Sequence, residues 1–228
     1  MMKKNGFTHA EVLITLAIIG VVATLTLPAL LTNTAEQQAK TALKKGINTL
    51  TEAAQMNQAV AGFDYASLTV SGVGSDSTET QSLYGLLSQR ASVDYTKSDE
   101  ASKIKLSSKD NDTYGTYKGG TTIDNGNYAL FFRDGSALLF PKDTVTNDKA
   151  AKMQEDNLVY GIKVIYDTIG TKGPNILSNC NSAAKGEEDK AANTCSPKSR
   201  VIKDQFGVRL RGGYAVPNGP AARWAFEN

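Results

Sequence analysis

The chain has 228 residues, of which 40% are hydrophobic and 21% are charged, and its formal net charge is +2. This length corresponds to one domain, with or without an appended element, and the composition excludes a multi-span membrane protein. A net charge so close to zero gives no overall sign of a nucleic-acid binder.

The first predicted element is an apolar helix near the N-terminus. Residues 12–31 form an uncharged run of twenty residues, which is the length that a helix needs to cross a bilayer. Lys3 and Lys4 precede it, and such a basic flank stays in the cytoplasm. Glu11, directly before the run, is the only formal charge between residues 4 and 36. A cleaved secretory signal has a shorter apolar core and a small-residue cleavage site, so we expect this helix to remain in the chain.

A plain signal-anchor helix explains the length and the basic flank but not the residues just before the run. The segment GFTHAEVLI, which begins at Gly6, resembles the N-terminus of type IV prepilins and type II secretion pseudopilins. In that family a membrane peptidase cuts after the glycine, and the new N-terminal residue is then N-methylated. The resemblance implies a leader of residues 1–6, cleavage between Gly6 and Phe7, and a mature chain that begins with N-methylated Phe7.

Two further positions match the family, and one pair departs from it. Glu11 falls on the family's glutamate, and Pro28 falls on its helix-kinking proline, which cannot donate an intrahelical hydrogen bond. His9 and Ala10 replace a more usual pair of bulky aliphatic residues, which leaves the processing residues intact. His9 is the only histidine in the chain, and we interpret it as an interfacial polar residue rather than as a metal ligand or a catalytic residue.

Glu11 is the predicted assembly residue. Cleavage before Phe7 would create an ammonium group four residues away, and a carboxylate in a low-dielectric setting is tolerated only when it is paired. In a fibre of parallel helices, the ammonium group of one subunit can meet Glu11 of a neighbour, which predicts a role in subunit registration. The alternative is that Glu11 extends to the membrane surface and pairs with nothing.

Residues 32–62 continue the helix with an amphipathic pattern. The predicted apolar stripe consists of Ala35, Ala39, Leu43, Ile47, Leu50, Ala54 and either Met56 or Asn57. Gly46 is an isolated weak point in this pattern, and Gly62 is a plausible stop. If the helix is continuous from residue 7 to residue 61, it is about 80 Å long. We expect its first half, residues 7–31, to lie in the membrane and its second half to pack on a globular domain.

Residues 63–228 predict this globular domain. The segment 82–89 favours a short helix, and 128–133 with 136–140 favour a hairpin around a two-residue Asp134-Gly135 turn. Residues 158–167 predict a third strand, and 206–210 and 214–217 predict two more. Several neighbouring strands after a long helix indicate an α+β fold with an antiparallel sheet packed on the helix. The prepilin resemblance implies the same pilin-like plan.

Cys180 and Cys195 enclose fourteen polar residues without periodicity. A domain that follows a membrane helix with a cytoplasmic N-terminus lies outside the cytoplasm, where a disulfide persists. Closing such a loop contributes roughly 3 kcal/mol in the chain-entropy model. A cystine-bounded loop near the C-terminus also resembles many pilins, so we predict a Cys180–Cys195 disulfide. A zinc site would need two further ligands, and none is in view.

The stretch from Asp167 to Asn175, with Asp204 later in the chain, resembles a C-terminal pattern of some bacterial pilin-like proteins. Asp167 and Asp204 are weak candidates for a calcium site, as some pseudopilins bind calcium in this region. The alternative interpretation is that both residues form turns, which is the commoner role of aspartate in such segments. We therefore predict no metal and no other cofactor.

The predicted function is structural and not enzymatic. The single histidine lies in the membrane segment, so no Ser-His-Asp or Cys-His site can form in the globular domain, and no phosphate-binding glycine motif is present. The resemblance implies a pilus or pseudopilus subunit in the bacterial inner membrane, with its N-terminus cytoplasmic, which assembles into a surface or periplasmic fibre. The implied partners are the lipid bilayer, the prepilin peptidase and N-methyltransferase, other pilin subunits, and an inner-membrane platform with its ATPase.

Two alternatives remain open. One is a minor tip subunit that binds a surface or nucleic acid, for which the chain offers a C-terminal basic and aromatic cluster. That cluster consists of Arg209, Arg211, Arg223, Trp224 and Phe226. The other is a membrane-anchored domain that shares the leader but does not polymerise.

Overall fold

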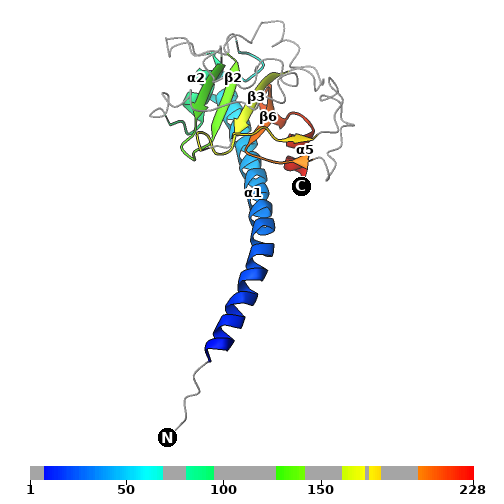
Figure 1. Ribbon diagram of the computed structural model, residues 1–228. Coiled ribbons are helices and arrows are strands. Elements are labelled where there is room, and N and C mark those ends of the chain that lie inside the picture. Colours follow the sequence, from blue (N-terminus) through cyan, green and yellow to red (C-terminus); the bar gives the residue numbers. More distant parts are fainter. Residues whose placement is uncertain (1–7, 69–80, 95–126, 142–160, 173–174, 181–199) are drawn as a thin grey trace. The chain divides into compact units, whose positions relative to one another are not determined.

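The computed structural model describes residues 8–68, 81–94, 127–141, 161–172, 175–180 and 200–228 (Figure 1). The chain divides into two compact units, Met1–Gln38 and Ala39–Asn228, and the boundary falls inside one long helix. The fold class is α+β, with an apolar N-terminal helix and an antiparallel sheet in the C-terminal part of the chain. This confirms the predicted α+β class, with an antiparallel sheet that follows a long N-terminal helix.

Helix α1 (His9–Ala61) is a single helix of 53 residues. It ends at Gly62, whose φ of +78° is the left-handed conformation that glycine adopts after a helix. The Gly62 N–H donates to the carbonyl oxygen of Gln58 at 3.1 Å and so closes the last turn. The prediction that Gly62 stops the helix is confirmed.

The second half of α1 buries most of the predicted stripe. The buried stripe residues are Ala39, Leu43, Ile47, Leu50, Ala54 and Asn57. Ala35 and Met56 are exposed, so the prediction was wrong for Ala35, and Asn57 is the member of the Met56/Asn57 pair that is buried. The amide of Asn57 remains hydrogen-bonded, because its Nδ2 donates to the carbonyl oxygen of Phe63 at 2.8 Å.

The sheet has five strands in the order β1-β2-β3-β6-β7, and every neighbouring pair is antiparallel. The strands are β1 (Asn127–Phe131), β2 (Ala137–Pro141), β3 (Ile162–Asp167), β6 (Gln205–Arg211) and β7 (Tyr214–Pro217). A separate two-stranded pair, β4 (Asn179–Cys180) and β5 (Arg200–Val201), lies between β3 and β6 in the chain. β7 has the predicted bounds, and β6 is one residue longer than predicted at each end. Residues 158–160 of the predicted third strand lie outside the described residues.

The β1–β2 connection corrects the predicted two-residue turn. The Phe132 N–H donates to the Ser136 carbonyl oxygen at 2.9 Å. This pair closes a connection of three residues, 133–135. Gly135 has a φ of +91°, as expected where a type I turn is followed by a left-handed residue. Asp134 favours this longer connection, because its Oδ1 accepts hydrogen bonds from both the N–H and the Oγ of Ser136, at 3.0 and 2.6 Å.

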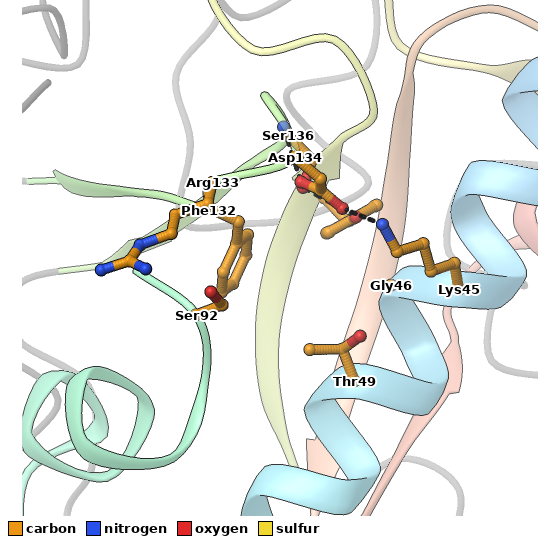
Figure 2. A pocket seen from close by; sticks show the side chains of 9 residues that line it. Lys45, Gly46, Thr49, Ser92, Phe132, Arg133, Asp134 and Ser136 are labelled. Atoms are coloured by element: carbon orange, nitrogen blue, oxygen red, sulfur yellow. Dashed lines mark hydrogen bonds and ion pairs between the residues drawn. The ribbon is translucent and has the colours of Figure 1, made fainter. Parts of the chain in front are cut away.

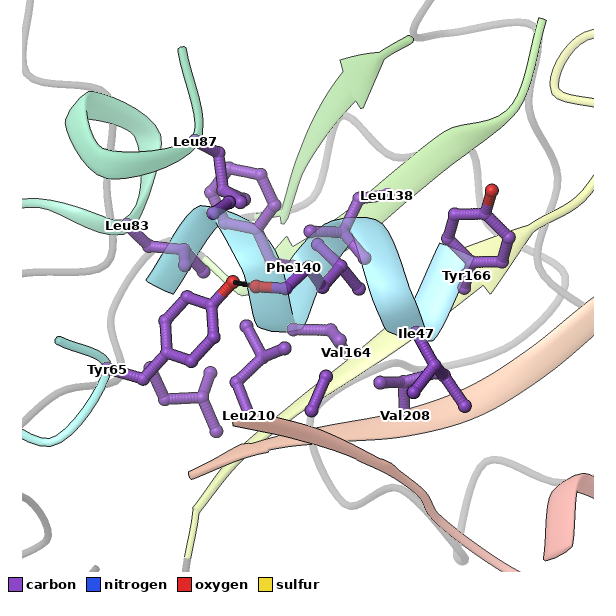
Figure 3. Packing of buried hydrophobic residues seen from close by; sticks show 14 of the residues in the cluster. Ile47, Tyr65, Leu83, Leu87, Leu138, Phe140, Val164, Tyr166, Val208 and Leu210 are labelled. Atoms are coloured by element: carbon purple, nitrogen blue, oxygen red, sulfur yellow. Dashed lines mark hydrogen bonds between the residues drawn. The ribbon is translucent and has the colours of Figure 1, made fainter. Parts of the chain in front are cut away.

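The main core lies between the second half of α1 and one face of the sheet (Figure 3). The sheet contributes Leu130, Leu138, Phe140, Ile162, Val164, Tyr166, Phe206, Val208, Leu210 and Ala215 to this core, together with Phe132 just after β1. They alternate with a smaller cluster on the opposite face, as the two-residue period of a strand requires. Tyr65 also enters the main core, where its hydroxyl donates to the Leu50 carbonyl oxygen at 2.6 Å. Burial raises the pKa of Tyr65 above its ordinary value.

Gly46 is the point of closest approach between α1 and the sheet. A Cβ at this position would overlap the ring of Tyr166, which is itself almost fully buried. The sequence pattern treats this glycine as a weak point of the helix, but the structure gives it a positive role. It allows a tyrosine ring to lie directly against the helix backbone.

The described residues of the second unit include two further, short helices. Helix α2 (Leu83–Arg90) confirms the predicted 82–89 segment, and Ser82 caps it by accepting a hydrogen bond from the Gly85 N–H at 2.9 Å. Helix α5 (Pro220–Glu227) was not predicted. Its signal was present in the sequence, because a proline that follows Gly219 occupies the first helical turn, where it is tolerated best.

Candidate functional site

The N-terminal half of α1 carries most of the exposed large hydrophobic side chains in the described part of the chain. Residues His9–Leu27 are long and apolar enough to cross a membrane, and none of them is buried within the described residues. The exposed fraction reaches 75% at Leu25 and 63% at Ile19. A helix that is apolar on all sides is suited to surroundings of lipid or of other helices.

Glu11 forms a capping box with Thr8 at the start of this helix. The Oε2 of Glu11 accepts hydrogen bonds from the Thr8 N–H at 2.8 Å and the Thr8 Oγ1 at 2.9 Å. In return, the Glu11 N–H donates to the Thr8 Oγ1 at 3.3 Å. The exchange satisfies two of the backbone donors that every helix start leaves open. Sequence reasoning missed this contact, although Thr-x-x-Glu before an apolar run is its recognised signature.

The structure does not describe the side chains of the other predicted processing and assembly residues. Gly6 and Phe7 lie outside the described residues, so the cleavage site remains a prediction. Pro28 lies within α1, which continues through it, but its side chain is outside the described part of the chain.

Asp167, at the end of β3, is buried among hydrogen-bond donors. Its Oδ1 accepts the backbone N–H groups of Ile169 at 3.0 Å and Gly170 at 2.8 Å. Its Oδ2 accepts the side-chain amides of Gln205 at 2.9 Å and Asn175 at 3.2 Å. Burial raises the pKa of Asp167 to about 7, although these hydrogen bonds favour the ionised form. The carboxylate therefore organises the turn after β3 and the start of β6.

Asp204 holds the other side of the same turn. Its carbonyl oxygen accepts the N–H and the Oγ1 of Thr168, both at 2.9 Å, and its carboxylate accepts the Ile176 N–H at 3.2 Å. Burial raises the pKa of Asp204. Among the described residues, no group of three or more His, Cys, Asp and Glu side chains is placed to hold a metal ion. The turn interpretation accounts for these contacts of Asp167 and Asp204.

Cys180 in β4 is buried and disulfide-bonded. The sequence offers one partner, Cys195, which lies outside the described residues. Ser178 secures the segment that leads to Cys180, because its N–H donates to the Gln205 carbonyl oxygen at 2.8 Å. Cys180 is thus connected to the same strand ends, the end of β3 and the start of β6, that Asp167 and Asp204 organise.

Two cations of the predicted basic and aromatic cluster are buried in β6. Arg209 and Arg211 are only 1% and 2% exposed, and Arg209 donates from Nε and Nη2 to the Oδ1 of Asn218 at 3.3 and 3.0 Å. The ring of Trp224 lies under the Nζ of Lys40, 3.9 Å from its centroid. Single-strand binding needs accessible cations and open aromatic faces, and these residues do not present them together.

A cavity of about 370 Å³ lies between α1 and the β1–β2 connection (Figure 2). It is lined by Lys45, Gly46, Thr49, Ser92, Phe132, Arg133, Asp134, Ser136 and Tyr166. The Nζ of Lys45 donates to the Oδ2 of Asp134 at 2.7 Å, at a rim where both side chains are partly exposed. Burial opposes ionisation of Asp134, but the hydrogen bonds from Lys45 and Ser136 outweigh it and hold the pKa of Asp134 below its ordinary value.

No family model, curated protein or solved structure matches this chain.

Three local arrangements in the described residues are candidates for a functional role. The first is the exposed apolar half of α1 with its carboxylate at Glu11. The second is the turn that Asp167 and Asp204 organise beside the disulfide. The third is the cavity beside Gly46, which sequence reasoning missed because its lining comes from four segments that are distant in the chain.

Proposed function

We propose that this chain is a structural subunit of a type IV pilus or a type II secretion pseudopilus. In this proposal a prepilin peptidase removes residues 1–6 at the inner membrane, and Phe7 is N-methylated. The processed subunit is anchored by the first half of α1, with its N-terminus in the cytoplasm and its globular unit outside. An inner-membrane platform with its ATPase then adds subunits to a helical fibre.

The observation that carries the proposal is the exposure of His9–Leu27, combined with a carboxylate in its first turn. In a simple membrane anchor an acidic residue at this position only caps the helix start, and its charge costs free energy if it enters the hydrocarbon region. A fibre subunit gains a specific contact there if a neighbour supplies a cation. The α+β plan, with a long helix whose second half packs on an antiparallel sheet, agrees with this proposal.

The capping box sharpens the proposed role of Glu11. Its Oε2 already lies 2.8 Å from the backbone nitrogen of Thr8, which would be the second residue of the mature chain. The new ammonium group would be one residue away, so Glu11 can pair with its own N-terminus or with that of a neighbour. In the proposal, the intramolecular contacts hold the carboxylate in place until a neighbouring subunit arrives.

Two substitutions test the proposal in cells. Gly6→Val should block cleavage and leave the full-length chain in the inner membrane. Glu11→Ala should leave cleavage largely intact and abolish or slow fibre assembly, because the carboxylate partner of the ammonium group is lost. Immunoblots of the membrane fraction and of sheared surface material report the two steps separately. Normal fibres from either variant would contradict the proposal.

Thr8→Ala is the matched control for Glu11→Ala. If Glu11 acted only by capping its own helix, the two substitutions would damage assembly equally, since each removes part of the same box. A role in pairing with a neighbour predicts that Glu11→Ala is much the more damaging of the two.

A membrane-anchored domain that does not polymerise is the remaining competitor. Cysteine substitutions at exposed positions of α1, such as Ile18→Cys, distinguish the two in native membranes. The fibre brings neighbouring helices together and predicts crosslinked multimers. Exclusively monomeric protein under the same oxidising conditions would favour the anchor. The burial of Arg209 and Arg211 weakens the case for a nucleic-acid-binding tip subunit, because it removes two of the three arginines of the predicted cluster from solvent.

A further inference from the structure

We draw no further inference here: the strongest candidate, the cavity between α1 and the β1–β2 connection, carries none, because the rings of Phe132 and Tyr166 in its wall are buried and nothing in the described residues shows what fills it.

Discussion

Both halves of α1 carry many apolar residues, yet these residues are exposed in the first half and buried in the second. In the first half Leu25 is 75% exposed, whereas in the second half Leu50 is fully buried against the sheet. The difference lies in the pattern, since the first half is apolar on every side and the second half carries one stripe among polar residues. Apolar content alone therefore does not decide where a helix is buried. The arrangement of apolar residues around the axis does.

The largest expected effect comes from truncating a leucine in each half. Leu50→Ala should lower the free energy of unfolding of the second unit by about 2–5 kcal/mol, because it opens a cavity in the main core. Leu25→Ala should leave that free energy unchanged. Denaturant titration of the two variants in the same detergent measures both. Equal destabilisation by the two substitutions would show that the first half is packed in protein like the second.

Replacing each of the two glycines of α1 by alanine should change stability by a smaller amount, and in opposite directions. Gly46→Ala should destabilise the second unit by about 1–3 kcal/mol, because the new methyl group overlaps the Tyr166 ring. Gly20→Ala meets nothing within 4 Å and should raise helix stability by about 0.5–1 kcal/mol. Thermal unfolding followed by circular dichroism compares them. A neutral Gly46→Ala would contradict the close approach of Tyr166 to the helix.

The second unit should also show a pH dependence that originates at Asp167. Its folded pKa of about 7 lies above the unfolded value of about 3.9, so its contribution to stability is full below that value and is lost as pH rises through 7. We expect the second unit to unfold at a higher temperature at pH 5 than at pH 8. Asp167→Asn should remove most of this difference.

Asp134 provides the control for Asp167, because its pKa is shifted in the opposite direction. Its folded pKa lies below the ordinary value, so its contribution is present at neutral pH and is lost as pH falls through the folded pKa. Asp134→Asn should therefore leave the difference between pH 5 and pH 8 in place. If Asp134→Asn and not Asp167→Asn removed it, the assignment to Asp167 would be wrong.

The smallest expected effect concerns the ion pair between α1 and the β1–β2 connection. Lys45→Gln should lower the free energy of unfolding by less than about 1 kcal/mol, because the Lys45 side chain is 61% exposed and solvent screens the pair. Lys44→Gln, at the neighbouring lysine, should change it less. A double-mutant cycle with Asp134→Asn isolates the pair. A coupling energy well above about 1 kcal/mol would contradict the screened geometry.

Periodic patterns predicted most of the elements. The stripe on α1, the sequence of strands and the Gly62 stop follow from spacings of three or four residues, from alternation and from the conformational freedom of glycine. Such patterns fail where a single hydrogen bond or a contact between distant segments decides the outcome. The β1–β2 connection has three residues because Asp134 bonds to Ser136, and no periodicity reports that contact.

The candidate site residues were predicted in the same uneven way. Glu11 is conspicuous in the sequence because it is a charge beside an apolar run, but its capping box with Thr8 was overlooked. Gly46 was interpreted as a defect, since its tyrosine partner is 120 residues away in the chain. Arg209 and Arg211 were grouped with Trp224 by sequence proximity, but the alternation of β6 places the arginines on the opposite side of the strand from Val208 and Leu210 and buries them.

The central claim is that this chain is processed as a prepilin, and intact mass spectrometry of the protein from native membranes tests it most directly. The account predicts a chain that begins at Phe7, without residues 1–6 and with one added methyl group on the N-terminal nitrogen. A chain that still carries residues 1–6, or one that has lost the apolar half of α1, would contradict it.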